Sequence, residues 1–299
     1  MKHLIIVFSA LCISAISYGQ FNVSVSSGYS IGSAGMKLGE KVNSTQTENT
    51  YGSYGEGLNL QVRGTYFFND KFGIDLALGY LNGADQTISK GYEFKEDGTL
   101  DTSVDINAIA RARAFGAAVS MVYKFNDNFY GRLGALVKVG GKTEAVVYKK
   151  DVFSDPEVAY FNSINIPLNS GSYTETNYVE DYHGHFPLGV VAALGYKFDL
   201  DTNFSLFVEA EYYGISLKRK DSEITEFNTD IVLPDGTVAV PSFYSLDNLP
   251  SGIYKESTYV DELSHTNTDG SKKLSQKVPY SSFGINFGIS YKFEGSNKK

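Results

Sequence analysis

The sequence predicts an all-β chain: a transmembrane, antiparallel, up-and-down β-barrel of about eight strands, with short turns at one end and long loops at the other. Three observations support this prediction. Apolar and polar residues alternate with a period of two, aromatic residues bracket short Asn/Asp turns three times, and short and long connections alternate along the chain. The composition fits, with 22 Tyr and 20 Phe, because barrel strands place apolar residues at alternate positions.

The first 19 residues have the pattern of a cleaved secretory signal peptide. Lys2 supplies a positive charge, residues 4–16 form an apolar run, and Ser17-Tyr18-Gly19 offers a small-x-small cleavage site. The run is shorter than the roughly 20 apolar residues that a spanning helix needs. We therefore expect residues 1–19 to be removed and residues 20–299 to form a single barrel domain.

Removal of this segment narrows the possible chemistry of the mature chain. The formal charge of -8 becomes -9 when Lys2 is lost, and the one cysteine, Cys12, is lost as well. Disulfides, thiolate metal sites and cysteine nucleophiles are thereby excluded. The acidic balance, without a clustered basic footprint, also argues against nucleic acid as a partner.

Three short segments are predicted to be tight turns between antiparallel strands. Each has an aromatic pair, a short Asn/Asp stretch and a further Phe, at residues 66–72, 123–129 and 196–204. Asn and Asp tolerate the left-handed backbone conformation that such turns require. These turns should therefore lie at one end of the barrel.

Eight segments around these turns alternate with the strand period of two. They are residues 21–29, 58–66, 72–80, 115–123, 129–137, 186–196, 204–212 and 283–293. One parity is apolar and aromatic at both strand ends, as expected of a lipid-facing surface with two aromatic girdles. The other parity is small or polar and should face the lumen.

Four long polar segments are predicted to be extracellular loops, at residues 32–57, 82–106, 141–181 and 218–280. Leu233-Pro234-Asp235-Gly236-Thr237-Val238 in the last one resembles a turn between extended runs. Strands are therefore expected to continue beyond the membrane there, and an exposed sheet edge could recruit a partner by strand addition.

The predicted lumen face carries ionisable residues. Because an eight-stranded barrel is only wide enough to be filled by side chains, we expect an ion-paired plug, since unpaired charges in such an interior are costly. Its members are predicted to be the acids Asp75, Glu209 and Glu211 and the bases Arg63, Arg132 and Lys138. A proton or ion path is the alternative interpretation of the same cluster.

The signal peptide, the repeated aromatic-turn-aromatic segments and the final strand, Phe283 to Phe293, resemble the small outer-membrane β-barrel family of Gram-negative bacteria, which includes OmpA-, OmpX- and OmpW-like barrels. The resemblance extends over the mature chain as an architecture. It implies an outer-membrane location, contact with outer-membrane lipid and lipopolysaccharide, and recognition of the last strand by the barrel assembly machinery. Here Glu294 to Lys299 follow the terminal aromatic, a departure from the family pattern.

Two residue pairs are candidates for more specific roles. His183 and His185 lie on one face of an extended segment, so they either bind a divalent metal or form a solvated strand end. Arg111 and Arg113 share the outward parity of Phe115 but lie beyond it, where they would either grip lipopolysaccharide phosphates or remain solvated.

The sequence favours a non-enzymatic outer-membrane protein that supports envelope integrity or surface interaction through its loops, with no cofactor. One alternative is a small channel or a porin for hydrophobic solutes. Another is a surface enzyme with a His-centred site at the loop end. A soluble secreted β-sandwich would not explain two aromatic girdles.

Overall fold

A computed structural model describes residues 20–293 of the chain. The predicted signal peptide, with Cys12, and the tail after Phe293 lie outside these residues. The described chain is built almost entirely of strands, with one short helix, so the predicted all-β class is confirmed. No helix among the described residues combines the length and the apolar character needed to cross a bilayer.

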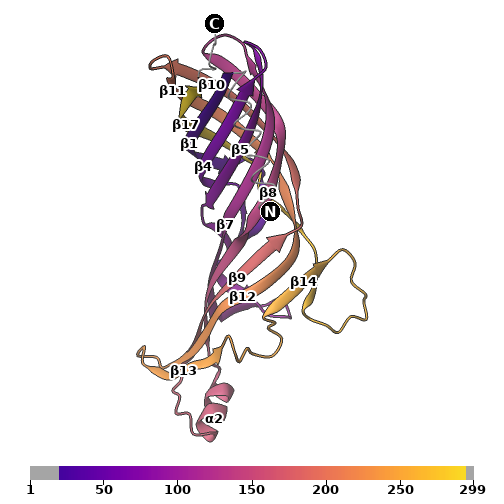
Figure 1. Cartoon of the computed structure of the whole chain (residues 1–299). Coiled ribbons are helices and arrows are strands. Elements are labelled where there is room, and N and C mark those ends of the chain that lie inside the picture. Colours follow the sequence, from indigo (N-terminus) through magenta and orange to yellow (C-terminus); the bar gives the residue numbers. More distant parts are fainter. Residues whose placement is uncertain (1–19, 294–299) are drawn as a thin grey trace.

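Eight strands pair side to side in a closed ring, which confirms the predicted strand number (Figure 1). In ring order they are β1 (Gln20–Gly32), β4 (Gly57–Phe67), β5 (Phe72–Gly83), β7 (Leu100–Lys124), β8 (Phe129–Val152), β10 (Leu188–Asp199), β11 (Phe204–Gly214) and β17 (Ser282–Phe293). Each neighbouring pair is antiparallel. The first and last strands close the ring, with Val25 opposite Ile289.

The period-two alternation divides every ring strand between an exposed and a buried face. In β4 the exposed Leu58, Leu60 and Val62 alternate with the buried Asn59 and Gln61. The exposed face is apolar and the buried face is polar, the reverse of a water-soluble barrel. Aromatic side chains collect at both ends of the exposed face, as in the contacts Phe72–Tyr123 and Tyr80–Phe115, each with ring centroids 4.9 Å apart.

The three short turns share one hydrogen-bonding design, which explains their repeated sequence. In the turn between β7 and β8, the Asn126 side-chain oxygen accepts backbone N–H groups from Asn128 at 3.0 Å and Phe129 at 2.8 Å. Asn69 and Asp201 play the same part in the other two turns. A local side-chain acceptor thus fixes each turn.

We expect Asn126→Ala to lower the free energy of unfolding by about 1 kcal/mol, since two backbone donors lose their acceptor. Urea titration of the protein in lipid vesicles measures this change. Asp127→Ala is the matched control, because Asp127 is exposed in the same turn and should change stability by under about 0.5 kcal/mol. Equal effects of the two substitutions would contradict this account of the turn.

The four long segments form strands, whereas the sequence predicts strand extension only for residues 218–280. Besides the outer parts of β7 and β8, they contain β2 (Met36–Val42), β3 (Thr47–Gly52), β6 (Gln86–Phe94), β9 (Tyr173–Gly184), β12 (Ser216–Val232), β13 (Val238–Ser245), β14 (Glu256–Val260), β15 (Lys272–Leu274) and β16 (Lys277–Pro279). Cross-strand pairing with β7 and β8, which local sequence does not encode, organises these polar residues.

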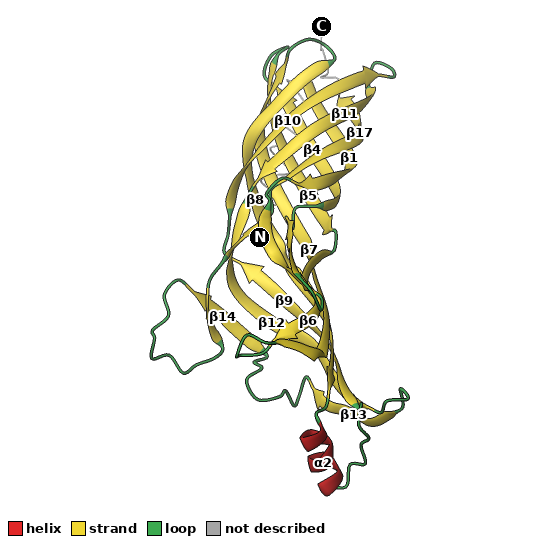
Figure 2. Cartoon of the chain, turned by 180° about the vertical axis from the view of Figure 1, so that it is seen from behind, coloured by secondary structure: helices red, strands yellow, loops and turns green. Residues whose placement is uncertain are grey.

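These strands form an outer sheet that continues from the ring (Figure 2). Strands β7 and β8 belong to both parts: β7 pairs with β5 inside the ring and with β6 beyond it, while β8 pairs with β10 and then with β9. The helix α2 (Asp155–Ser163) lies at the far tip near β13. The short turns and the outer sheet therefore lie at opposite ends of the molecule.

Candidate functional site

The centre of the ring holds a compact network of ion pairs. Arg132 on β8 contacts three acids: its Nε donates to Glu209 Oε1 at 2.7 Å, one Nη to Glu211 Oε1 at 2.7 Å, and the other Nη lies 3.4 Å from Asp75 Oδ1. Arg63 on β4 reaches across to Glu209, with its Nη1 2.6 Å from Oε2. Five of the six predicted members of the plug therefore meet.

Neutral side chains satisfy the remaining carboxylate oxygens. Glu211 Oε2 accepts hydrogen bonds from Gln61 Nε2 at 2.7 Å, Asn286 Nδ2 at 2.6 Å and the Tyr213 hydroxyl at 2.7 Å. Asp75 Oδ2 accepts one from the Thr65 hydroxyl at 2.8 Å. Tyr213 is a member of the network that was not predicted, although it shares the inward parity of Glu209 and Glu211 on β11.

Burial makes this network costly to disturb. Glu209 is 0% exposed and Glu211 and Asp75 are each 1% exposed, while each arginine is 4% exposed. A buried ion survives only when opposite charges and hydrogen bonds replace its lost hydration. Residues of five ring strands, β4, β5, β8, β11 and β17, supply these charges and hydrogen bonds. The network therefore links strands on different sides of the ring.

The predicted place of Lys138 in this network is wrong. Its Nζ donates instead to the backbone carbonyl of Gly141 at 2.8 Å. A β-bulge begins just beyond this residue: Phe115 pairs with Gly140 and Gly116 with Lys138, so Val139 has no partner in the β7–β8 ladder. The reason is distance along the strand: Lys138 lies three steps of the alternation beyond Arg132, toward the outer sheet, and so it is too far along β8 to join the central acids.

Two cavities flank the network, and Arg132 lines both. The turn-side cavity is polar, has a volume of about 530 Å³, and is also lined by Arg63, Asp75, Lys124 and Lys292. The outer cavity, toward the outer sheet, is smaller at about 110 Å³ and is lined mainly by apolar residues. The Arg132 side chain therefore lies between the two cavities.

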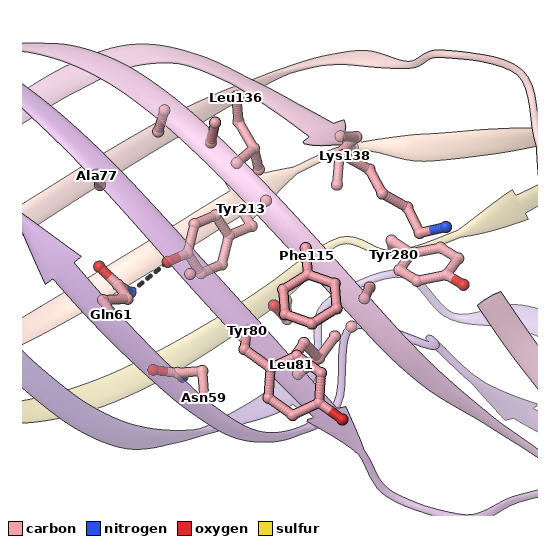
Figure 3. A pocket seen from close by; sticks show the side chains of 18 of the residues that line it. Asn59, Gln61, Ala77, Tyr80, Leu81, Phe115, Leu136, Lys138, Tyr213 and Tyr280 are labelled. Carbon is pink, nitrogen blue, oxygen red and sulfur yellow. Dashed lines mark hydrogen bonds between the residues drawn. The ribbon is translucent and has the colours of Figure 1, made fainter. Parts of the chain in front are cut away.

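The outer cavity exists because the strands around it carry small inward residues (Figure 3). Gly79 on β5 and Gly116 on β7 are directly opposite each other in the ladder, so no side chain fills that position. Ala77 pairs with Ala118 beside them. Larger lining residues close the cavity from other sides, namely Leu81, Leu136, Tyr213, Ile215, Leu217 and Tyr280.

The two candidate metal-binding histidines are exposed at the end of β9. His183 Nδ1 lies 2.8 Å from Asp221 Oδ1 on β12, the neighbouring strand. Among the described residues, no three His, Cys, Asp or Glu side chains gather in a way that could hold a metal ion. The arrangement at His183 is a surface contact between two strands of the outer sheet.

Arg111 and Arg113 lie on the outer face just beyond the ring, in different electrostatic settings. Arg111 Nε donates to Glu144 Oε2 at 2.7 Å, whereas the Arg113 guanidinium donates to the backbone carbonyls of Gly83 and Ala112, both at 3.0 Å. Partial burial raises the pKa of the Glu144 carboxyl, but hydrogen bonds from Arg111 and Lys142 outweigh it and leave that pKa lowered. The Arg111 charge is offset by an acid, whereas no acid in the described part of the chain pairs with Arg113.

Comparisons with known proteins find only distant similarity to solved structures. No family model and no curated protein matches the sequence. The solved structures found are small outer-membrane β-barrel proteins, the group that the sequence resembles. OprG of Pseudomonas aeruginosa is 14% identical, with a TM-score of 0.39 over 93% of this chain and 97% of that chain.

Two further solved structures have similar scores. AlkL, determined in DMPC lipid bilayers, is 16% identical with a TM-score of 0.35 over 95% of each chain. Ail of Yersinia pestis, in complex with a heparin analogue, is 10% identical with a TM-score of 0.28 over 92% of this chain and 99% of that chain. We therefore base the function on this chain's own residues.

Proposed function

We propose that this chain is a non-enzymatic outer-membrane protein: a transmembrane, antiparallel, up-and-down β-barrel of residues 20–299, whose four long segments face the outside of the cell. The apolar outer face of the ring supports this proposal. Phe287 at 65%, Leu78 at 59% and Val62 at 53% exposure lie near the middles of their strands, where water would be a poor solvent and lipid a good one. A closed ring also leaves no strand edge unpaired in hydrocarbon.

We further propose that the barrel is a platform for surface interaction and not an axial channel. The buried charge network is the observation that supports this. It fills the middle of the lumen with paired arginines and carboxylates. The rigid outer sheet would then be the interacting part. Among its described strands, β3 pairs only with β2 and β13 only with β12, so each offers a free edge for strand addition.

Gel migration and planar-bilayer conductance test this function together. We expect the unboiled protein from isolated outer membranes to migrate differently from the boiled protein, as folded barrels do, and to give no discrete conductance steps. Folded migration with channel steps would overturn the platform function. A soluble protein without a mobility shift would overturn the membrane assignment itself.

A second candidate function is the binding of small hydrophobic molecules in the outer cavity. The observation that favours it is the lining: Leu81, Leu136 and Ile215 border a space that Gly79 and Gly116 leave open. Small-molecule sites are typically concave and mostly apolar with few polar groups. This function is compatible with a closed axis, because the cavity lies on the outer side of the network.

We also propose that Arg111 and Arg113 contact lipopolysaccharide phosphates, with Arg113 making the stronger contact. Because Arg113, unlike Arg111, has no acidic partner among residues 20–293, Arg113→Ala should weaken lipopolysaccharide binding by about 3- to 10-fold, as expected for one phosphate contact. Arg111→Ala should have a smaller effect. Gel-shift titration of the folded protein with lipopolysaccharide measures both affinities.

The exposed Lys41 on β2 serves as a control for this experiment. Lys41→Ala removes one positive charge from the outer sheet, away from the end of the ring. A loss equal to that of Arg113→Ala would indicate a general charge effect and would contradict a phosphate contact at Arg113.

A further inference from the structure

Lys138 is a half-buried cation at the outer cavity without a counter-charge. Its Nζ donates to the Gly141 carbonyl at 2.8 Å, and no carboxylate of residues 20–293 lies within ion-pair distance of it. An ammonium group has three donors, so two are available to another acceptor. The acids of the central network are committed to Arg63 and Arg132 and do not reach it.

The surroundings of this cation are apolar. Leu136 precedes it by one alternation on the same face of β8, and the pair Gly79–Gly116 leaves the neighbouring space open. In Figure 3 the Lys138 side chain extends toward the ring of Tyr280, another residue of the lining. Arg132, which also lines this cavity, is paired with the network acids, so Lys138 is the cation left for a ligand. An apolar space with such a positive group at one end fits a molecule with an apolar body and a single negative group.

A bulge at Val139 lies immediately beyond this cation. Lys138 and Gly116 form the last pair of the ring register before the bulge, and Gly116 has no side chain to cover the cation. Gly141 closes the bulge at a φ of +88°, and a Cβ there would lie 1.9 Å from the Arg113 carbonyl oxygen. A glycine is therefore required at this position, and the Gly141 carbonyl in turn orients the ammonium group.

We propose that the outer cavity binds a small amphiphilic carboxylate, with its apolar body against Leu136 and Ile215 and its carboxylate on Lys138 Nζ. This inference rests on the second candidate function, the cavity as a site for hydrophobic molecules, and it names the ligand class. A charge-assisted hydrogen bond in a partly desolvated place is stronger than a neutral one. The carboxylate should therefore be preferred to the matching alcohol.

Octanoate and octanol are suitable probes because their apolar chains match and their head groups differ. Their affinities are measured by calorimetric titration of the folded protein in lipid nanodiscs, with titration into empty nanodiscs subtracted. We expect the wild-type protein to bind octanoate about 10-fold more tightly than octanol. This comparison uses the wild-type protein alone and does not depend on the folding of any variant.

Two substitutions at one position then test the role of the ammonium group. Lys138→Met keeps the length of the side chain without its charge and should abolish the preference for octanoate, while Lys138→Arg should retain it. The folded state of each variant is checked by heat-modifiable gel migration. A preference that persists in Lys138→Met, or equal wild-type affinities for both probes, would overturn the carboxylate proposal and leave hydrophobic binding standing.

Gly116→Leu tests whether the outer cavity is the binding site, independently of whether Lys138 binds a carboxylate. A Cβ at Gly116 meets only ordinary contacts, at 3.5 Å from the Val137 carbonyl oxygen and 3.6 Å from Leu136 Cδ1, so the larger side chain should occupy the cavity and weaken both probes. Absence of binding of either probe to the wild-type protein would overturn both the cavity function and the carboxylate proposal.

Mass spectrometry of organic extracts from the purified protein distinguishes two sources of the same chemistry. Free carboxylates enriched over the bulk membrane extract would identify a soluble amphiphile as the ligand. Enrichment of an anionic membrane lipid instead would contradict a free carboxylate as the natural occupant and would assign the Lys138 site to a lipid.

Discussion

Arg132→Met is expected to lower the free energy of unfolding by about 3–5 kcal/mol, the cost of removing one partner from a buried ion network. Arg132 is the only described cation that contacts Asp75, Glu209 and Glu211 together. Its loss leaves two or three carboxylates in a space with little water and with Arg63 as the remaining cation. Urea titration in lipid vesicles, followed by heat-modifiable migration, measures the change.

Lys138→Met is a matched control for this experiment, because Lys138 lies on the same strand and inward face but outside the network. We expect it to cost under about 1 kcal/mol. Adding Glu211→Gln to Arg132→Met should recover part of the loss, since a neutral side chain needs no counter-charge and Glu209 keeps its pair with Arg63. A single Arg132→Met variant as stable as Lys138→Met would show that the network is not a stabilising plug.

Leu78→Arg is expected to lower the free energy of unfolding in lipid vesicles by about 2–4 kcal/mol, the cost of an arginine at the middle of a membrane-spanning strand. Leu78 lies near the middle of β5, and its side chain is 59% exposed on the outer face of the ring. In water such a substitution on an exposed site would be close to neutral. The measurement is the urea midpoint of refolding into vesicles.

Thr225→Arg provides the control in the outer sheet. Thr225 is exposed on β12, outside the eight-stranded ring, so an arginine there should change stability by under about 0.5 kcal/mol. Similar small effects at Leu78 and Thr225 would mean that the ring is surrounded by water, and the membrane assignment would then be wrong.

The sequence by itself determined the local features of the ring. Alternation with a period of two depends only on the strand geometry of successive residues, so the faces of β4 and of its ring neighbours could be predicted without knowledge of their partners. The three turns were predictable for the same reason, since Asn69, Asn126 and Asp201 bond to backbone groups within three residues. The inward parity of Glu209 and Arg132 followed directly.

Only the tertiary structure decided which of these residues meet. Arg132 and Glu211 are 79 positions apart in the sequence, and their contact depends on the stagger of strands around the closed ring, which alternation does not encode. Only the assembled ring shows that Lys138, on the same strand and inward face as Arg132, lies at the outer cavity and outside the network. The outer sheet likewise depends on β7 and β8 offering their free edges to polar segments, because pairing with those edges is what orders residues whose own sequence favours a loop.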